Sequence, residues 1–148
     1  MAESQIKVSS IMFTDIAGYS RMVARDESQA LKLLDEHNNI IKKSIEGHDG
    51  HIIKLIGDSV FAEFDSPISC AQSAINIQSR FDKRNPLCRK IDRILVRIGL
   101  HYGKVVVKDD DLFGNDVNMC SRFEGAAPPG GISTTSAIAE RISENDEH

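Results

Sequence analysis

The sequence predicts an α+β sandwich, in which one mainly antiparallel sheet is covered by helices. Along the chain, segments that alternate apolar and polar residues are interleaved with segments whose apolar residues recur every three or four positions. Tight turns separate several of the strand-like segments, so hairpins and antiparallel pairing are expected. No repeat, low-complexity stretch or linker divides the 148 residues, so we expect residues 1–148 to form a single domain.

The first half of the chain is expected to contain a strand, a helix and a hairpin. Residues 6–14 are rich in apolar and β-branched types and predict a strand, which the turn-like DIAGYS follows. Over residues 26–46, apolar residues fall on one face of a helix. Residues 51–64 are two apolar runs around Gly57-Asp58, which predicts a hairpin whose turn carries the carboxylate.

The second half begins with a helix signal. Ser66 and Pro67 supply an N-cap and a proline at the first helical position, opening a helix that continues to Phe81. Residues 94–101 alternate so that Arg97 points away from the main apolar face. The remaining expected elements are a return strand over 104–108 after Gly103, a short helix over 115–124, a loop at 128–131, a brief strand at 132–134, and a helix from Thr135 or Ser136 to Ile142.

Bulk properties exclude several classes of function. A net charge of −4 argues against a surface that binds nucleic acid or makes direct contact with a membrane. No apolar run reaches the roughly 20 residues that a membrane helix needs, and the N-terminus lacks the pattern of a secretory signal. Three scattered cysteines indicate neither a disulfide framework nor a zinc site. We therefore expect a cytoplasmic location, either alone or as the cytosolic portion of a larger or membrane-anchored protein.

Two pairs of polar residues together suggest a metal-and-phosphate site, although their spacing alone does not establish one. Asp15 ends a strand and Asp58 lies in a hairpin turn, so on neighbouring strands they would converge and suit a hard cation such as Mg²⁺. Asn118 and Arg122 are four residues apart on the expected short helix, which suits a phosphate or a ribose. Simpler interpretations remain open: each aspartate can be a turn or cap residue, and Arg122 can be a surface residue that pairs with Glu124.

Other signals are weaker or absent. Lys54 within a strand is ordinarily an edge lysine that limits strand pairing, and 109–111 is ordinarily a solvated acidic turn. The chain contains no phosphate-binding GxxxxGK[ST] loop, no GxGxxG after a strand and no GxSxG elbow. The histidines lack metal-ligand spacing and are expected at the core edge or the surface: His37, His48, His51, His101 and His148.

Four blocks of the sequence together resemble a known family. FTDIAGYS (13–20), KLIGDSVFAEF (54–64), RIGLHYGKV (97–105) and DLFGNDVNMCSRFEGAAPPGGI (111–132) resemble, in order, the signature blocks of class III adenylate and guanylate cyclases. The resemblance implies a ferredoxin-like βαββαβ core of the nucleotidyl cyclase fold, working as a head-to-tail homodimer. Family members continue with further strands that carry a phosphate-contacting lysine, so we expect this chain to be truncated at its C-terminus.

The resemblance also implies a role for each candidate residue. Two divalent ions, Mg²⁺ or Mn²⁺, would be held by Asp15, Asp58 and the backbone carbonyl of Ile16. Arg97 would contact the phosphates, Lys54 and Asp111 would contact the adenine edge, and Asn118 and Arg122 would orient the ribose and stabilise charge on the α-phosphate. The implied reaction is in-line attack of the ribose 3′-hydroxyl of ATP on the α-phosphate, giving cyclic AMP and pyrophosphate.

The resemblance implies that Lys54 and Asp111 contact the base, and this pair would then favour adenine over guanine. Asp111 can accept from the exocyclic amino group of adenine while Lys54 donates to a ring nitrogen, and guanine presents the opposite pattern. The guanylate branch of the family typically has Glu and Cys at these two places. Two alternatives remain: an inactive cyclase homology domain that serves as a dimerisation or nucleotide-sensing module, and a ferredoxin-like interaction domain unrelated to nucleotides.

Overall fold

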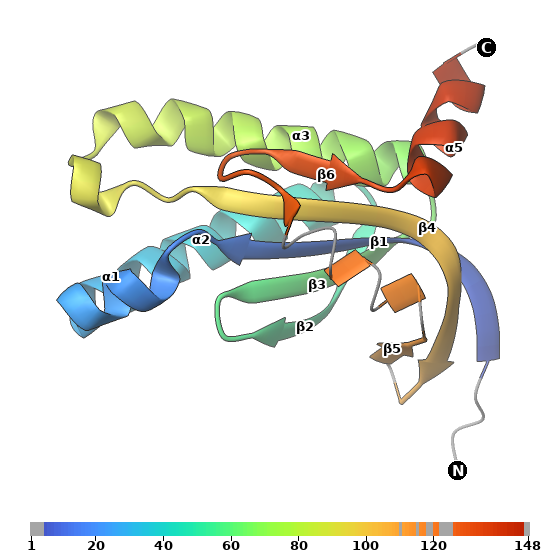
Figure 1. Cartoon of the computed structure of the whole chain (residues 1–148), viewed down its shortest axis with the longest axis horizontal. Coiled ribbons are helices and arrows are strands. Elements are labelled where there is room, and N and C mark those ends of the chain that lie inside the picture. The colour runs from blue at the N-terminus through green and yellow to red at the C-terminus, as the bar shows by residue number, and fades with distance from the viewer. Residues whose placement is uncertain (1–4, 110, 115, 118–119, 122–125, 147–148) are drawn as a thin grey trace.

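A computed structural model describes residues 5–109, 111–114, 116–117, 120–121 and 126–146, with backbone alone for 143–146. It confirms the expected α+β sandwich of one sheet covered by helices (Figure 1). The elements are β1 (Gln5–Ile16), α1 (Tyr19–Arg25), α2 (Glu27–Gly47), β2 (Gly50–Ile56), β3 (Ser59–Phe64), α3 (Pro67–Arg84), the 3-10 turns η1 (Asn85–Leu87) and η2 (Lys90–Asp92), β4 (Val96–Lys108), β5 (Asp111–Phe113), β6 (Ile132–Thr134) and α5 (Ser136–Asp146).

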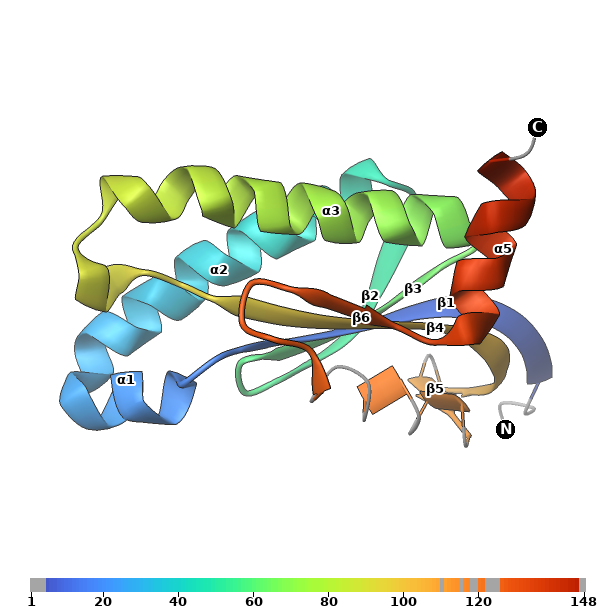
Figure 2. The same ribbon diagram turned by 45° about the horizontal axis from the view of Figure 1, so that its top comes forward.

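The sheet has the strand order β2-β3-β1-β4-β5, and β6 adds to β4. All pairs are antiparallel except β4 with β6. The longest pairing is between β1 and β4, which run together from Gln5 opposite Val107 to Ile16 opposite Val96. Helices α2 and α3 lie across one face of the sheet, and β5 lies on the other side (Figure 2).

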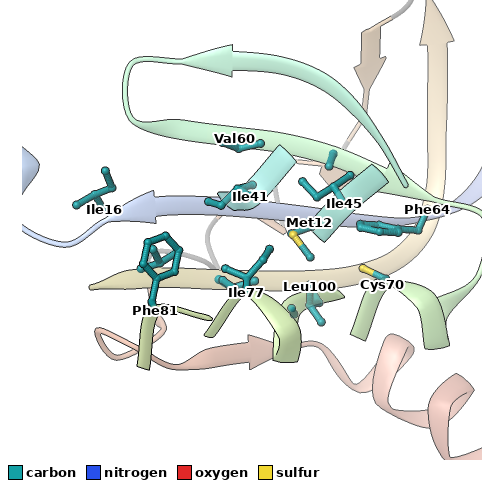
Figure 3. Close-up of a cluster of buried hydrophobic side chains, with 14 of the residues drawn as sticks. Met12, Ile16, Ile41, Ile45, Val60, Phe64, Cys70, Ile77, Phe81 and Leu100 are labelled. Carbon is teal, nitrogen blue, oxygen red and sulfur yellow. The ribbon is translucent and has the colours of Figure 1, made fainter. Parts of the chain in front are cut away.

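Strand alternation divides the apolar residues between the two faces. The larger cluster lies under α2 and α3, where Met12, Val60 and Leu100 of the strands meet Ile41 and Ile77 of the helices (Figure 3). A smaller cluster lies on the opposite face and consists of Ile11, Phe61, Val105, Leu112, Val117 and Cys120. The helix-covered face therefore supplies most of the apolar burial, and the opposite face keeps room for polar side chains.

Helix starts follow their sequence signals. The Asp26 side chain accepts a hydrogen bond from Gln29 N at 3.1 Å at the start of α2, and Ser66 caps α3 through Ser69 N at 3.3 Å. Helix α1, by contrast, was not predicted, because DIAGYS was interpreted as a turn. It has seven residues and none is buried, so it has no apolar stripe that a periodicity search could detect.

The expected hairpin at Gly103 is wrong. Strand β4 continues through Gly103 to Lys108, and the chain reverses only around Asp109, whose φ is 52°. Gly103 serves a packing purpose instead: a Cβ there would lie 2.6 Å from Cγ of Asp116 and 2.8 Å from Nε2 of His101. The glycine leaves space for the Asp116 carboxylate to cross the strand.

Candidate functional site

Asp15 and Asp58 converge because their strands are neighbours. Asp15 is the penultimate residue of β1, and Asp58 lies in the β2–β3 turn beside it, since β3 pairs with β1. The Asp58 Oδ2 atom accepts a hydrogen bond from the backbone N–H of Ile16 at 2.8 Å. This bond holds the Asp58 carboxylate against the residue that follows Asp15. The two strands are neighbours, as expected, and the convergence of both carboxylates on a metal ion stays a prediction.

Arg97 is bound to Asp15 through two hydrogen bonds. The two residues are cross-strand partners in β1 and β4, and Arg97 Nε and Nη2 donate to Asp15 Oδ1 and Oδ2 at 2.9 and 2.7 Å. Such a bidentate pair orients both side chains. The side chains are 31% and 17% exposed, so the pair remains accessible to solvent and to a competing ligand.

Lys54 and Asp111 form a second ion pair, which links opposite edges of the sheet. Strands β2 and β5 stand at the two ends of the strand order, yet Lys54 Nζ lies 2.9 Å from Asp111 Oδ2. The sheet therefore curls until its edges meet. Burial would raise the pKa of Asp111, but hydrogen bonds from Lys54 and from the Leu112 backbone N–H outweigh it, so the pKa is lower than usual.

Both ion pairs lie on the face of the sheet opposite α2 and α3. Lys54 is the cross-strand partner of Phe61, and Phe61 is the partner of Phe13, which shares a face with Asp15 two residues later. The Phe13 and Phe61 rings stack with centroids 4.3 Å apart, and Lys54 Nζ lies 5.8 Å from the Phe61 centroid. A stacked aromatic pair thus separates two charged pairs on one surface.

The residues present fit a divalent cation. Two carboxylates at adjacent strand ends supply hard oxygen ligands, which Mg²⁺ and Mn²⁺ prefer. In the described part of the chain, no group of three or more His, Cys, Asp or Glu side chains gathers as a metal cage. Asp15 and Asp58 could supply the acidic ligands of a cation site, to which backbone oxygens or a phosphate group would add ligands.

Asn118 and Arg122 lie outside the described residues, but parts of the segment around them are placed. Residues 116–117 and 120–121 are helical. Val117 belongs to the smaller apolar cluster, and Cys120 Sγ donates weak hydrogen bonds to Ile11 O and Gly99 O at 3.5 and 3.4 Å. The segment is therefore anchored on the same face as the two ion pairs.

A polar network that the sequence does not predict lies beside this segment. His101 Nδ1 lies 2.7 Å from Thr135 Oγ1, and Nε2 lies 2.6 Å from Asp116 Oδ1. Because a carboxylate only accepts, Nε2 carries a proton and donates it. Asp116 Oδ2 also accepts from Lys104 N at 3.1 Å. The network joins β4, the start of the helical segment and the cap of α5.

The expectation that the histidines lie at the core edge or the surface is wrong for two of them. His101 is 4% exposed and His37 is fully buried. Burial lowers the pKa of His37, and its Nδ1 lies 2.9 Å from Asn38 Oδ1. The only sequence signal was position: His37 falls on the apolar stripe of its helix, and an inward histidine needs partners that the sequence does not identify.

Comparison with known proteins gives a consistent result. The family model of the adenylate and guanylate cyclase catalytic domain matches residues 1–147. A putative adenylate cyclase 3 of Rhizobium meliloti is 32% identical over 145 residues, covering 96% of this chain and 25% of the relative. An adenylate cyclase of Anabaena cylindrica is 32% identical over 152 residues, covering 90% and 30%. The chain thus spans less than a third of the length of either relative.

Solved structures match the fold closely. An adenylate/guanylate cyclase/hydrolase from Silicibacter pomeroyi superposes with a TM-score of 0.89 at 30% identity, covering 97% of this chain and 84% of that one. The adenylyl cyclase CyaB from P. aeruginosa gives a TM-score of 0.80 at 22% identity, covering 96% and 83%. Among the described residues, no helix combines the length and apolar character needed to cross a membrane.

Proposed function

The chain belongs to the adenylate and guanylate cyclase catalytic domain family, and on this premise we propose that it converts ATP into 3′,5′-cyclic AMP and pyrophosphate. The observation that carries the choice of ATP is the Lys54–Asp111 ion pair, with 2.9 Å between Nζ and Oδ2. The adenylate cyclases among its relatives support the same choice.

The ion pair offers one donor and one acceptor to a base edge. The lowered pKa of Asp111 keeps its carboxylate ionised at neutral pH, so it can accept from the exocyclic amino group of adenine. Lys54 can donate to a ring nitrogen of the same base. Guanine places a carbonyl and an N–H there, which would leave both protein groups unmatched. The pair therefore favours ATP over GTP.

The carboxylates of Asp15 and Asp58, with the backbone carbonyl of Ile16, would hold two divalent ions. When bound, Mg²⁺ or Mn²⁺ supplies positive charge that neutralises the triphosphate and lowers the pKa of the ribose 3′-hydroxyl. Arg97 has a second role available to it. Its guanidinium is partly exposed and bound to Asp15 at the surface, so a phosphate group can compete for the same fork of donors.

The remaining chemistry falls to Asn118 and Arg122. Asn118 would hydrogen-bond the ribose and hold its 3′-hydroxyl in line with the bond that breaks. As the 3′-oxygen bonds to the α-phosphorus, the bond to the bridging oxygen breaks, pyrophosphate leaves and the hydroxyl proton passes to water. Arg122 would stabilise the negative charge that develops on the α-phosphate oxygens.

These roles are divided between two copies of the chain. In the family arrangement, Asp15, Asp58 and Arg97 come from one copy, and the base- and ribose-contacting residues come from the other. This chain carries both half-sets, and its two ion pairs are partly exposed on the same face of the sheet, separated by the stacked Phe13 and Phe61 rings. A homodimer formed through this face would complete two equivalent sites related by a two-fold axis.

The test is to incubate the purified chain with Mn²⁺ and either ATP or GTP and to identify the cyclic product by chromatography. Cyclic AMP should form preferentially. Asp58→Asn should abolish it, while Asp82→Asn, which neutralises an exposed carboxylate on α3, should not. A preference for GTP would overturn the adenine assignment. Binding of ATP without any cyclisation would favour the inactive nucleotide-sensing module instead.

A further inference from the structure

The segments that leave β1 and enter β4 form a hollow whose lining begins at Ala17, directly after Ile16. Because β1 and β4 pair antiparallel up to Ile16 and Val96, the residues beyond these strand ends lie together. Between them is a cavity of about 300 Å³, with α1 forming one wall and residues 90–93 the other. Both walls lie at the end of the molecule away from α5 (Figures 1 and 2).

The hollow is strongly basic. Four cationic side chains line it, two from α1 and two from the segment before β4: Arg21, Arg25, Lys90 and Arg93. All four residues are exposed. None of the described residues that line the cavity is acidic. Met22 and Ile91 supply an apolar part of the lining.

The charge in the hollow is not neutralised by the protein. Within the described ranges, Arg21, Arg25 and Lys90 have no ion-pair partner. Arg93 donates from Nε to the Asn85 carbonyl at 3.2 Å, which satisfies one donor but not its charge. Arg21 and Arg25 are also four residues apart on a helix, where like charges repel.

The two acids that are adjacent in the chain to these cations, Asp26 and Asp92, have other partners. Asp26, next to Arg25 in the chain, accepts the capping hydrogen bond from Gln29 N. Asp92 accepts from Arg89 Nε at 2.8 Å and from Gln29 Nε2 at 3.3 Å. In a chain whose net charge is −4, four clustered cations without an ion-pair partner among the described residues create a local positive potential that would attract an anion.

We propose that this hollow binds a small, multiply charged phosphate anion of the pyrophosphate class. Two arginines present forked donors that match phosphate oxygens, and Lys90 on the opposite wall adds a point charge. The lining includes neither of the candidate metal-binding aspartates and neither Lys54 nor Asp111, although Ala17 and Gly18 of the lining directly follow Ile16. Anion binding in the hollow can therefore be tested apart from cyclase activity.

The experiment is calorimetric titration of pyrophosphate into the chain at fixed ionic strength, with a chelator present to remove divalent cations. Wild type should bind. The triple substitution Arg21→Gln, Arg25→Gln, Lys90→Gln should weaken binding by about tenfold or more, because each charge-assisted hydrogen bond contributes of that order. The control triple removes the same charge from the exposed surface of α2 and should leave the affinity unchanged: Lys32→Gln, Lys42→Gln, Lys43→Gln.

Further variants in the same titration distinguish binding in this hollow from binding elsewhere on the chain. Asp58→Asn should bind pyrophosphate as wild type does, and Arg21→Lys with Arg25→Lys should weaken binding less than the triple, because charge remains but the fork is lost. Thermal melts confirm that each variant is folded. No binding by wild type, equal losses in both triples, or loss in Asp58→Asn would each overturn the proposal. So would binding to phosphatidylcholine vesicles that contain phosphatidic acid without binding of free pyrophosphate.

Discussion

The two ion pairs on the face of the sheet opposite α2 and α3 are brought together in different ways. Asp15 and Arg97 are cross-strand partners in the longest strand pairing, so the β1–β4 register alone brings them together. Lys54 and Asp111 stand on opposite edge strands and meet only because the sheet curls. Strand β2 also shifts register between Ile52 and Lys54. The first pair depends on local pairing, and the second depends on the shape of the whole sheet.

This difference separates two tasks of a nucleotide site. The region around Asp15 and Asp58 needs a fixed geometry to hold a cation. The regular β1–β4 pairing and the hydrogen bond from Ile16 N to Asp58 provide that geometry. In the proposed site the Lys54–Asp111 pair would provide specificity for the base, and it joins β2 to a β5 strand of only three residues. Both pairs are partly exposed, so each contributes little to stability and can exchange its partner for a ligand.

The largest expected loss of activity comes from substituting Asp15 or Asp58. Asp15→Asn or Asp58→Asn should lower cyclisation roughly a thousandfold or more, because a metal ligand and its negative charge are lost together and metal catalysis supplies several kcal/mol. Turnover of ATP with Mg²⁺ and Mn²⁺ measures the effect. Circular dichroism should show an intact fold. Near-normal turnover in either folded variant would disprove the metal assignment.

The base-contacting pair should change substrate choice. Lys54→Glu with Asp111→Cys should shift the ATP-to-GTP preference toward GTP by roughly a hundredfold, because two mismatched hydrogen-bonding groups are replaced. The measurement is kcat/KM for each nucleotide. Arg97→Lys is the contrasting variant. This variant should slow turnover of both nucleotides alike and leave the ratio of their kcat/KM values unchanged, since in the proposed site Arg97 would contact phosphate and not the base. A shifted ratio in Arg97→Lys would remove the distinction between the two regions.

Much of this arrangement follows from the sequence alone. Alternation in 94–101 correctly placed Arg97 away from the apolar face, and Gly57-Asp58 correctly marked the β2–β3 turn. The pairing of Lys54 with Asp111 did not follow from the residues, which suggested an edge lysine and a solvated turn. The curvature of the sheet depends on all of its strands together. A local sequence pattern therefore does not show which two edge strands will come into contact.

The errors have a common physical cause. Gly103 was interpreted as a turn residue, whereas it provides space for Asp116, and the partner that explains it is 13 positions away in the chain. The His101 network was missed for the same reason, because its partners lie in separate segments. The periodicity of apolar residues indicates which face of a strand or helix is buried. It does not identify the residues from distant segments that pack there, so contacts between buried polar groups are not predicted from it.

Mixing inactive chains should test whether the two regions act in different copies. Asp58→Ala and Arg122→Ala chains, each inactive alone, should recover about a quarter of wild-type activity when mixed. With random pairing, half the dimers are mixed and each has one intact site of two. Steady-state cyclic AMP formation measures the recovery. No recovery, with chain exchange confirmed by size measurements, would mean that each site is built within one chain.

The smallest effect concerns the stability contributed by the Lys54–Asp111 pair. A double-mutant cycle with Lys54→Met and Asp111→Asn should give a coupling of about 0.2–1 kcal/mol near neutral pH, because the side chains are 38% and 27% exposed. The pKa of Asp111 is lowered from 3.8, so the folded state favours the carboxylate. The coupling should therefore persist above the unfolded pKa and disappear as the pH falls through the folded one.

Urea unfolding of the four proteins across this pH range measures the coupling energy, with Asp82→Asn as an exposed control. A coupling that grew on acidification would contradict the ion pair.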